Sequence, residues 1–372
     1  MRSIASLLLV LIFATQGFAQ KKDYNLIVGT YTSPGKSEGI YIYNFDLNTA
    51  DFKLRSVAKA VTNPSYLAVA KNNKFVYSVA EAPDNSAVAA FGFDGVKGEL
   101  SFLNKQATTS KGPCFVMAND KHAFSANYGG GSLSVFSIEG NGSLSPLKQL
   151  VQHTGKSIDP KKRQESAHVH QVQFTPDKKY VVCTDLGEDQ VYIYNYNPMG
   201  GDKVLSLKNV TKTNAGSGPR HLTFSPNGKF AYLAHEFNGS ITTFRYADGV
   251  LTKLQETGTV DKDFEGRVDA ADIHVSPDGN FLYETNRGDA NTISVFAVKP
   301  DGKLSFVETV STMGKGPRNF VIDPTGKYLL VGHQYTNDVV IFERNKKTGT
   351  LKDTGKRMDI GAPVCLIFAP VK

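Results

Sequence analysis

Residues that could bind an anion and move a proton stand at the two ends of one short hairpin. Residues 217–236 read as a strand, a turn and a return strand, with Arg220 and Glu236 on opposite sides of the turn. Antiparallel pairing brings both to the same end of the hairpin, on strands ~5 Å apart. Arginine binds carboxylate or phosphate and stabilises a developing oxyanion, and a carboxylate can act as a base. Taken alone, the pair is equally consistent with an ordinary ion pair.

The hairpin recurs, and its recurrence predicts the fold. The position six residues before the turn falls in successive copies at Ser65, Cys114, His170, Arg220, Ala271, Arg318 and Val364, with spacings of 46–56 residues. This period, with about four strands per copy, indicates a β-propeller. The last copy contains only its first strand, and residues 24–29, 39–44 and 52–55 supply the three that are missing. We therefore predict an all-β, seven-bladed β-propeller whose ring is closed by N-terminal strands pairing with the C-terminal strand.

This architecture predicts which side chains meet. The first strand of each blade lines the central channel, so the reference positions encircle one mouth. A second ring follows sixteen residues later, at Glu81, Gly130, Leu186, Glu236, Arg287 and Gln334. The candidate site therefore combines His168, His170, Gln171, Arg220, His221, Glu236, Arg287, Arg318 and Gln334. The alternative is a solvated channel mouth, where polar residues are expected without any function.

The types of residue at the mouth limit the reactions that the site could catalyse. A histidine near neutral pKa can take a proton from water or from a carbon acid, while arginines hold an anionic group. No helical stretch is expected to follow the one Gly-x-Ser-x-Gly segment, residues 35–39, and no serine is flanked by a plausible triad, which argues against an acyl-enzyme mechanism. Hydrolysis of a lactone by base-activated water needs only a histidine, a carboxylate and arginines. Lactone formation or opening by proton transfer needs the same groups.

Composition and the N-terminus predict where the protein acts. One arginine, an apolar run of about ten residues and small residues at Gly17 and Ala19 form a signal-peptide pattern. We expect residues 1–19 to be a signal peptide, residues 20–372 to be a single domain, and the mature protein to be periplasmic or secreted. An uncleaved anchor is the alternative. No later segment is expected to span a membrane.

The net charge of +7 over 372 residues points to a small anionic partner. The lysines are scattered through turns rather than grouped in a stripe, which argues against nucleic acid. We expect a monomer acting on a small anionic substrate.

Cysteine and histidine spacing gives no metal-binding pattern. The three cysteines, Cys114, Cys183 and Cys365, lie in predicted strands without ligand spacing, so we expect buried free thiols and no metal or cofactor. A calcium or magnesium ion held by Glu81, Asp272 and Glu236 remains open. Four strand histidines are expected to be structural: His122, His235, His274 and His333. Residues 152–167 form an extra polar loop, where function often resides.

Several motifs together resemble a known family. They are residues 167–171 (Ala-His-Val-His-Gln), 216–221 (Gly-Ser-Gly-Pro-Arg-His), 235–236 (His-Glu), 285–287 (Thr-Asn-Arg) and 316–318 (Gly-Pro-Arg). The mature chain resembles the seven-bladed propeller lactonases. These include propeller-type 6-phosphogluconolactonases and fungal 3-carboxy-cis,cis-muconate lactonizing enzymes. The resemblance implies a metal-independent site in which His170, Glu236, Arg220 and Arg287 are catalytic.

The resulting expectation is a lactone hydrolase acting on a sugar-acid lactone, 6-phosphogluconolactone being the family's type substrate. His170 would be the base, Glu236 would orient it or share that role, and Arg220 and Arg287 would stabilise the oxyanion. His168, Gln171, His221, Arg318 and Gln334 would bind substrate. The alternatives are a cycloisomerase of the carboxymuconate type and a non-catalytic, exported ligand-binding propeller. Export is unexpected for a phosphosugar enzyme, so the substrate itself stays open.

Overall fold

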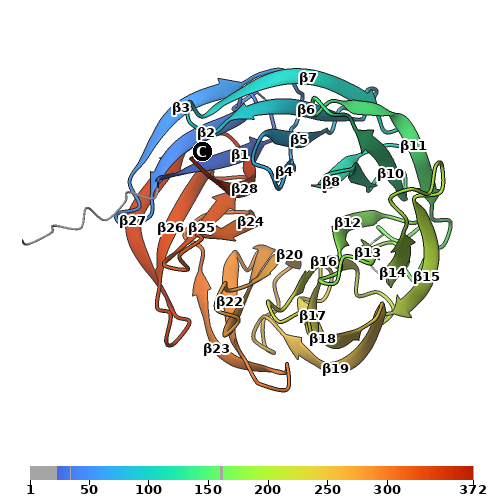
Figure 1. Cartoon of the computed structure of the whole chain (residues 1–372). Helices are drawn as coiled ribbons and strands as arrows, with labels where there is room; N and C mark the ends of the chain where they lie inside the picture. Colours follow the sequence, from blue (N-terminus) through green and yellow to red (C-terminus); the bar gives the residue numbers. More distant parts are fainter. Residues whose placement is uncertain (1–22, 34, 160–161, 372) are drawn as a thin grey trace, which may run out of the picture.

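The computed structural model describes residues 23–33, 35–159 and 162–371. Within these ranges all regular structure is β, with 28 strands in seven four-stranded antiparallel sheets. The sheets stand radially around a central channel, as Figure 1 shows. The predicted seven-bladed β-propeller is thus confirmed. The expected signal peptide, residues 1–19, lies outside the described residues.

The ring is closed by pairing between the two ends of the chain. One blade consists of β28 (Pro363–Pro370), β1 (Asp23–Thr30), β2 (Ile40–Asp46) and β3 (Phe52–Ala58), in that order from the channel outward. β28 and β1 run antiparallel, with Tyr24 opposite Pro370 and Val28 opposite Leu366. This pairing leaves no free sheet edge between the first and last blades, as predicted.

The other six blades each contain four strands consecutive in the chain, with the first strand of each beside the channel (Figure 1). They are β4 (Leu67–Val69), β5 (Phe75–Ala80), β6 (Ala87–Asp94) and β7 (Glu99–Ala107); β8 (Pro113–Ala118), β9 (His122–Asn127), β10 (Ser132–Ile138) and β11 (Leu144–Gln152); β12 (Val169–Phe174), β13 (Tyr180–Asp185), β14 (Gln190–Tyr196) and β15 (Leu205–Lys212); β16 (Pro219–Phe224), β17 (Phe230–His235), β18 (Ser240–Ala247) and β19 (Val250–Gly258); β20 (Val268–Val275), β21 (Phe281–Gly288), β22 (Thr292–Val298) and β23 (Leu304–Ser311); β24 (Pro317–Ile322), β25 (Tyr328–His333), β26 (Asp338–Arg344) and β27 (Leu351–Asp359).

The core lies between neighbouring blades. Strands in the middle of a blade are covered on both faces, which explains why all six residues of β17 are buried. Between two of the blades, for example, Val182 and Ile193 pack against Leu222 and Leu233, and each is at most 2% exposed. Burial of one such side chain contributes about 1.5–3 kcal/mol to the stability of the fold. Because many such side chains pack closely between the blades, the ring is a rigid frame for its mouth.

A repeated contact joins neighbouring blades. Tyrosine hydroxyls of one blade donate to a glycine carbonyl in an outer turn of the next, in the pairs Tyr77–Gly142, Tyr232–Gly302 and Tyr283–Gly349. At Gly142, φ is +88°, and an added Cβ would lie 2.2 Å from the Phe75 ring. Only glycine allows this close approach, which explains its recurrence in the outer turns.

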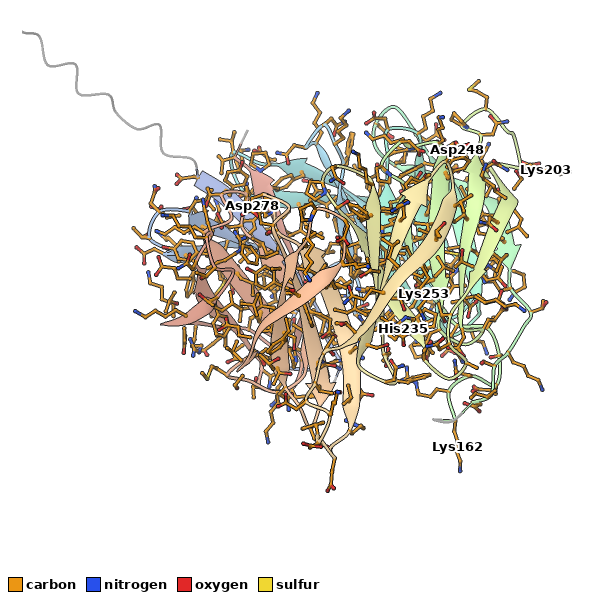
Figure 2. The ribbon with its side chains drawn as sticks, turned by 90° about the horizontal axis from the view of Figure 1, so that it is seen from below. Lys162, Lys203, His235, Asp248, Lys253 and Asp278 are labelled. Atoms are coloured by element: carbon orange, nitrogen blue, oxygen red, sulfur yellow. The ribbon has the colours of Figure 1, made fainter. Side chains whose placement is uncertain are left out.

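The two faces of the ring carry different features. In the edge-on view of Figure 2, Lys162 lies at one face, while Asp248 and Asp278 lie at the opposite one. Lys162 belongs to the loop before β12, at the end of the blades where the candidate site residues gather. The described residues include no helix long and apolar enough to cross a membrane. Cys114, Cys183 and Cys365 are buried free thiols, as predicted.

Candidate active site

Four of the mouth residues occupy β-bulges at the start of innermost strands. The pairing register shifts at Arg220, and the same shift recurs at Cys114, His170 and Arg318 in their own blades. A bulge leaves one residue unpaired and redirects its side chain. These four blades therefore each present one non-alternating side chain at the same mouth.

Glu236 is the centre of the site and is only 2% exposed. Its Oε1 lies 2.7 Å from Arg163 Nη1 and 3.1 Å from Arg287 Nη2, and its Oε2 lies 3.1 Å from Arg220 Nε. The predicted convergence of Arg220, Glu236 and Arg287 is therefore present. Arg163 is an additional member that the sequence analysis did not single out.

The charges around Glu236 set its protonation. Burial opposes ionisation, but Arg287, Arg220 and Arg163 outweigh it and lower the pKa of Glu236 to about 2. Burial and the charges of Arg287 and Arg318 lower the pKa of Arg220 to about 9, so this guanidinium remains charged at neutral pH. At neutral pH the cluster therefore consists of one ionised carboxylate surrounded by positively charged guanidiniums.

Two of the guanidiniums are also held by the backbone. Arg220 Nη1 donates to the carbonyl of Ala271. Arg287 donates to the carbonyls of Asp269 and Ala270, both at 3.3 Å. The contact between Arg220 Nε and Glu236 Oε2 is ionic without hydrogen-bond geometry, and both atoms are buried without a hydrogen-bond partner. These atoms therefore retain hydrogen-bonding capacity for a ligand.

Arg163 reaches the site from the loop between β11 and β12. Its Nη2 donates to the Tyr128 hydroxyl at 2.8 Å, and its guanidinium lies 5.1 Å from the centre of the Phe237 ring. The side chain is 39% exposed, unlike those of Arg220 and Arg287. The extra polar loop was the one available signal for this residue, because nothing in the repeat corresponds to it.

His170 has the properties of a free base. It is 4% exposed, its ring centre lies 5.6 Å from that of Tyr128 and 5.2 Å from that of His221, and its Nδ1 is buried without a hydrogen-bond partner. Burial and the charge of Arg220 lower the pKa of His170 well below its usual range, so the imidazole is neutral at pH 7.

The expected relationship between His170 and Glu236 requires a correction. Glu236 was expected to orient His170 or to share the role of base. Its carboxylate contacts arginines instead, and no hydrogen bond from any described residue holds the His170 ring. With a pKa of about 2, Glu236 is also a weak base at neutral pH. Its position suits the organisation of the guanidiniums rather than proton transfer.

Tyr128 connects the histidines to Arg163. His168 stacks on the Tyr128 ring at 4.4 Å, and its Nδ1–H donates to the Tyr128 carbonyl at 2.8 Å. His168 and His170 thus meet the same aromatic ring, in agreement with their expected common direction. Tyr128 was also absent from the predicted site, because the β8–β9 hairpin is two residues shorter than the β16–β17 hairpin. Pro113 pairs with Asn127 whereas Pro219 pairs with His235, so Tyr128 occupies the slot of Glu236 and the sixteen-residue offset pointed to Gly130 instead.

His221 and Gln171 belong to the channel wall. Asp272 accepts from His221 Nδ1 and from His274 Nε2, each at 2.9 Å. Burial opposes ionisation of Asp272, but the two histidines hold its pKa well below the usual range. His274, expected to be a lone structural histidine, therefore shares a carboxylate with His221. Gln171 Oε1 accepts from the Leu222 amide at 2.7 Å and so links two blades.

Arg318 and Gln334 lie at the same end of the β24–β25 hairpin. The Arg318 guanidinium lies 5.5 Å from the centre of the Tyr31 ring. Gln334 donates its backbone N–H to the Gly316 carbonyl at 2.9 Å, and its side-chain Oε1 is buried without a partner. Glu81, another residue of the predicted second ring, accepts from the Ser65 hydroxyl at 2.6 Å.

Within the described ranges, one trio of side chains has the spacing of a metal site, His153 with Asp185 and Glu188. Both ring nitrogens of His153 are already engaged, one by Asp185 and the other by the Tyr194 hydroxyl, each at 2.7 Å. We interpret the trio as a hydrogen-bonded support for the loop. The possible cation ligands Glu81, Asp272 and Glu236 are not brought together in this way.

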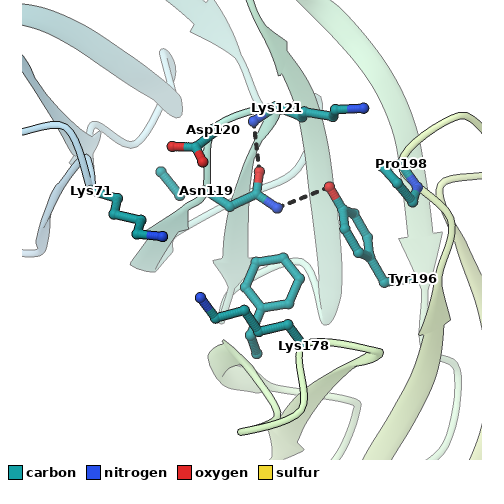
Figure 3. A pocket seen from close by; sticks show the side chains of 9 residues that line it. Lys71, Asn119, Asp120, Lys121, Lys178, Tyr196 and Pro198 are labelled. Atoms are coloured by element: carbon teal, nitrogen blue, oxygen red, sulfur yellow. Dashed lines mark hydrogen bonds between the residues drawn. The ribbon is translucent and has the colours of Figure 1, made fainter.

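A separate cavity of about 460 Å³ lies at the turns between the first and second strands of three blades. Figure 3 shows Lys71 and Lys178 at this cavity, with Asn119 bonded to Tyr196 at 2.9 Å. The turn carrying Lys178 lies near Asp248, which accepts from Tyr180 at 2.8 Å. The cavity therefore opens on the face opposite the candidate site.

Comparison with known proteins identifies the family. The family described as lactonase, 7-bladed beta-propeller, matches residues 25–368. The chain belongs to this lactonase family. It is 38% identical to a 6-phosphogluconolactonase from Bacillus subtilis over 346 residues, which cover 92% of this chain and 97% of that protein. The resemblance found in the motifs is thus confirmed.

Solved structures of similar proteins extend the comparison. A Bacteroides fragilis protein is 43% identical, with a TM-score of 0.89 over 94% of this chain and 98% of that one. A periplasmic gluconolactonase from Pseudomonas aeruginosa is 35% identical, with a TM-score of 0.89 over 94% of this chain and all of that one. The lactonase fold is therefore shared along nearly the whole described chain.

Proposed function

We propose that this protein hydrolyses the lactone ring of a sugar acid, in the manner of a 6-phosphogluconolactonase. The observation that carries the proposal is the position of His170. Its neutral imidazole has no hydrogen bond to a described residue, and it lies at a mouth where Arg163, Arg220 and Arg287 converge. The named activities of the Bacillus subtilis and Pseudomonas aeruginosa relatives support it.

In the proposed reaction His170 takes a proton from a water molecule as the water oxygen attacks the lactone carbonyl carbon. The carbonyl oxygen becomes an oxyanion, which Arg220 and Arg287 stabilise with donors not used by Glu236. The ring C–O bond then breaks, and the departing alkoxide takes the proton from the imidazolium. The product is a hydroxy acid, whose carboxylate remains near the same arginines.

The low pKa of His170 suits the second half of this reaction. An imidazolium surrounded by buried cations is a strong acid, so it readily protonates the alkoxide leaving group. The neutral form dominates at physiological pH, which makes the base available without prior deprotonation. Glu236 limits the mutual repulsion of the three arginines and thereby keeps them at one place.

We propose that no metal ion or cofactor takes part, because side chains supply the base, the acid and the oxyanion binder. Activity should then survive dialysis against a chelator. Loss of activity on chelation, with recovery on adding a divalent cation, would refute this part of the proposal.

We further propose that the protein is exported as a monomer after removal of residues 1–19. The signal-peptide pattern supports export, and the similarity to a periplasmic gluconolactonase is consistent with it. Mass spectrometry of the protein from a periplasmic extract should give an N-terminus at or next to Gln20. An intact Met1 on the purified protein would contradict cleavage. Light scattering of the purified protein should give the molar mass of a monomer.

A panel of lactones tests the activity itself. Purified mature protein is mixed with 6-phosphogluconolactone, gluconolactone and other aldonolactones in ¹⁸O-labelled water, and acid release is followed. Hydrolysis places one solvent oxygen in the product carboxylate. A cycloisomerase would add none, and a non-catalytic binding protein would leave the spontaneous rate unchanged while a ligand still raised its melting temperature.

A further inference from the structure

The cavity on the face opposite the candidate active site combines positive charge with aromatic walls. Its volume is about 460 Å³, within the range of small-molecule sites, roughly 300–1,000 Å³. Lys71, Lys121 and Lys178 reach it from the turns of three neighbouring blades, and Asp120 is the one acidic residue in its lining. None of the three lysines forms an ion pair with a described residue. The lining therefore carries a net positive charge.

Two of these lysines have free amino groups. Neither Lys71 nor Lys178 donates a side-chain hydrogen bond to a described residue. Figure 3 shows their amino groups extending from two different blades into the cavity. Lys121 differs, because its amino group lies 3.7 Å from the Met199 sulfur. An ammonium group binds an anion as a point charge with three donors, so the free pair suits a carboxylate placed between them.

The two free lysines occupy turn positions at which other blades carry different residues. The slot of Lys71 holds proline in four blades, at Pro176, Pro226, Pro277 and Pro324. The slot of Lys178 holds glycine in three blades, at Gly228, Gly279 and Gly326. Lys178 has a φ of +57°, in the left-handed region that is unfavourable for residues other than glycine. Lysine thus stands where glycine would be less strained, which points to a use of its side chain.

Phe174 and Tyr196 form a rigid aromatic wall. Their ring centres lie 5.0 Å apart, and both rings pack edge-on against Phe124, which is fully buried. The Tyr196 hydroxyl accepts from Asn119 at 2.9 Å and lies 2.9 Å from His122 Nδ1. Burial lowers the pKa of His122 to about 4, so the imidazole is neutral and its Nδ1 accepts the hydroxyl proton. The wall is therefore fixed in place by protein contacts alone.

The neutral polar groups of the wall are already engaged. Asn119 Oδ1 accepts from the backbone N–H groups of Lys121 and His122, at 2.8 Å and 2.7 Å. Its Nδ2 donates to Tyr196, whose hydroxyl has no further proton to donate. Few partners remain for the hydroxyl groups of a sugar, whereas the aromatic surface and the two ammonium groups are free.

We propose that this cavity binds a small organic acid with an aromatic body. The carboxylate of the acid lies between Lys71 and Lys178, and its ring packs on Phe174 and Tyr196. The site is separate from the mouth that contains His170 and Glu236. It does not depend on the proposed lactone hydrolysis.

Calorimetric titration of the mature protein with simple acids tests the ligand class. Benzoate and 2-naphthoate supply both a ring and a charge. Acetate lacks the ring, benzyl alcohol lacks the charge, and gluconate carries hydroxyl groups in place of the ring. Each of these three should bind at least about tenfold more weakly than benzoate, because each loses one of the two contacts.

Variants then locate the bound acid. Lys71→Gln and Lys178→Gly should each raise the Kd of benzoate at least about tenfold. Lys178→Gly introduces the residue that three other blades use, so its melting temperature should equal or exceed that of the parent. Lys53→Gln, on the exposed outer strand β3, is the control and should leave the Kd unchanged. Arg220→Gln removes a charge from the mouth and should also leave it unchanged.

Three results would overturn the site. The first is the absence of binding by both aromatic acids, and the second is equal affinity for benzoate and acetate. The third is loss of benzoate binding in Arg220→Gln with no change in the two lysine variants, which would place the acid at the mouth instead.

Discussion

Arg163 Nη1 lies 2.7 Å from Glu236 Oε1, joining the longest irregular loop of the propeller to the residue at the centre of its mouth. Glu236 follows a rigid inner hairpin, whereas Arg163 belongs to a loop with no counterpart in the other blades. The same guanidinium bonds to Tyr128, whose ring contacts His170. One partly exposed loop side chain thus connects the carboxylate cluster with the proposed base.

Replacing Arg163 should impair catalysis more than stability. In Arg163→Ala we expect kcat/KM for the hydrolysed lactone to fall roughly ten- to a hundredfold, because both the Glu236 contact and the Tyr128 contact are lost. Arg163→Lys keeps the charge but cannot bond both groups at once, so it should recover only part of the rate. Arg245→Ala, on an outward-facing position of β18, is the control. A kcat/KM for Arg163→Ala equal to that of the control would remove Arg163 from the site.

Replacing Glu236 should destabilise the protein at neutral pH. Glu236→Gln leaves buried guanidiniums without their counter-charge, which should lower the free energy of unfolding by about 3–5 kcal/mol. Urea denaturation measures the difference, with Glu99→Gln on an exposed outer strand as the matched control. An unchanged unfolding midpoint would show that the cluster does not need its carboxylate.

The same pair of proteins tests the acid dependence of stability. The pKa of Glu236 falls from an ordinary 4.5 to about 2 in the folded protein. A lowered carboxyl pKa contributes stability above the unfolded value, and this contribution is lost as pH falls through the folded value. The parent protein should therefore lose more stability between pH 4.5 and 2 than Glu236→Gln does. Parallel stability curves across that interval would contradict the lowered pKa.

The pH dependence of the rate reports on His170. Burial and Arg220 lower the pKa of this histidine, and the neutral form is the active base, so the acid limb of kcat/KM should lie below pH 6.5. In Arg220→Gln, loss of the nearby charge should move that limb to higher pH. A limb at or above pH 6.5 in the parent protein, or no displacement in the variant, would argue against His170 as the base.

Much of this structure follows from the sequence because the propeller repeats. The turn pattern predicts the strand pairs and their order, and it places Arg220, Glu236 and Arg287 at one mouth. Closure between residues near Tyr24 and Pro370 followed from counting strands. Because the unit repeats, the strand register of one hairpin predicts that of the others, and the register predicts which side chains are neighbours.

The remaining features depend on residues that lie outside the repeat or on side-chain direction. Arg163 reaches Glu236 from a loop that has no equivalent. Tyr128 occupies the slot of Glu236 in a hairpin that is two residues shorter, which a constant sixteen-residue offset misses. Glu236 contacts Arg220 rather than His170, and both Arg220 and His170 lie at register shifts that a simple two-residue alternation does not describe.

Asp272 should stabilise the folded channel wall. Asp272→Asn removes the charge shared by His221 and His274, so the melting temperature should fall by several degrees, corresponding to about 3–5 kcal/mol. Asp301→Asn, in an exposed outer turn, is the control. Equal melting temperatures for the two variants would mean that the histidines need no buried carboxylate.

The most direct test of the account is the rate of lactone hydrolysis by His170→Gln. The control is His122→Gln, which replaces a buried histidine bonded to Tyr196 on the opposite face. The account predicts that kcat falls at least about 100-fold in His170→Gln while the folded structure and the control's rate are retained. A His170→Gln protein that hydrolyses the lactone as fast as the control would contradict it.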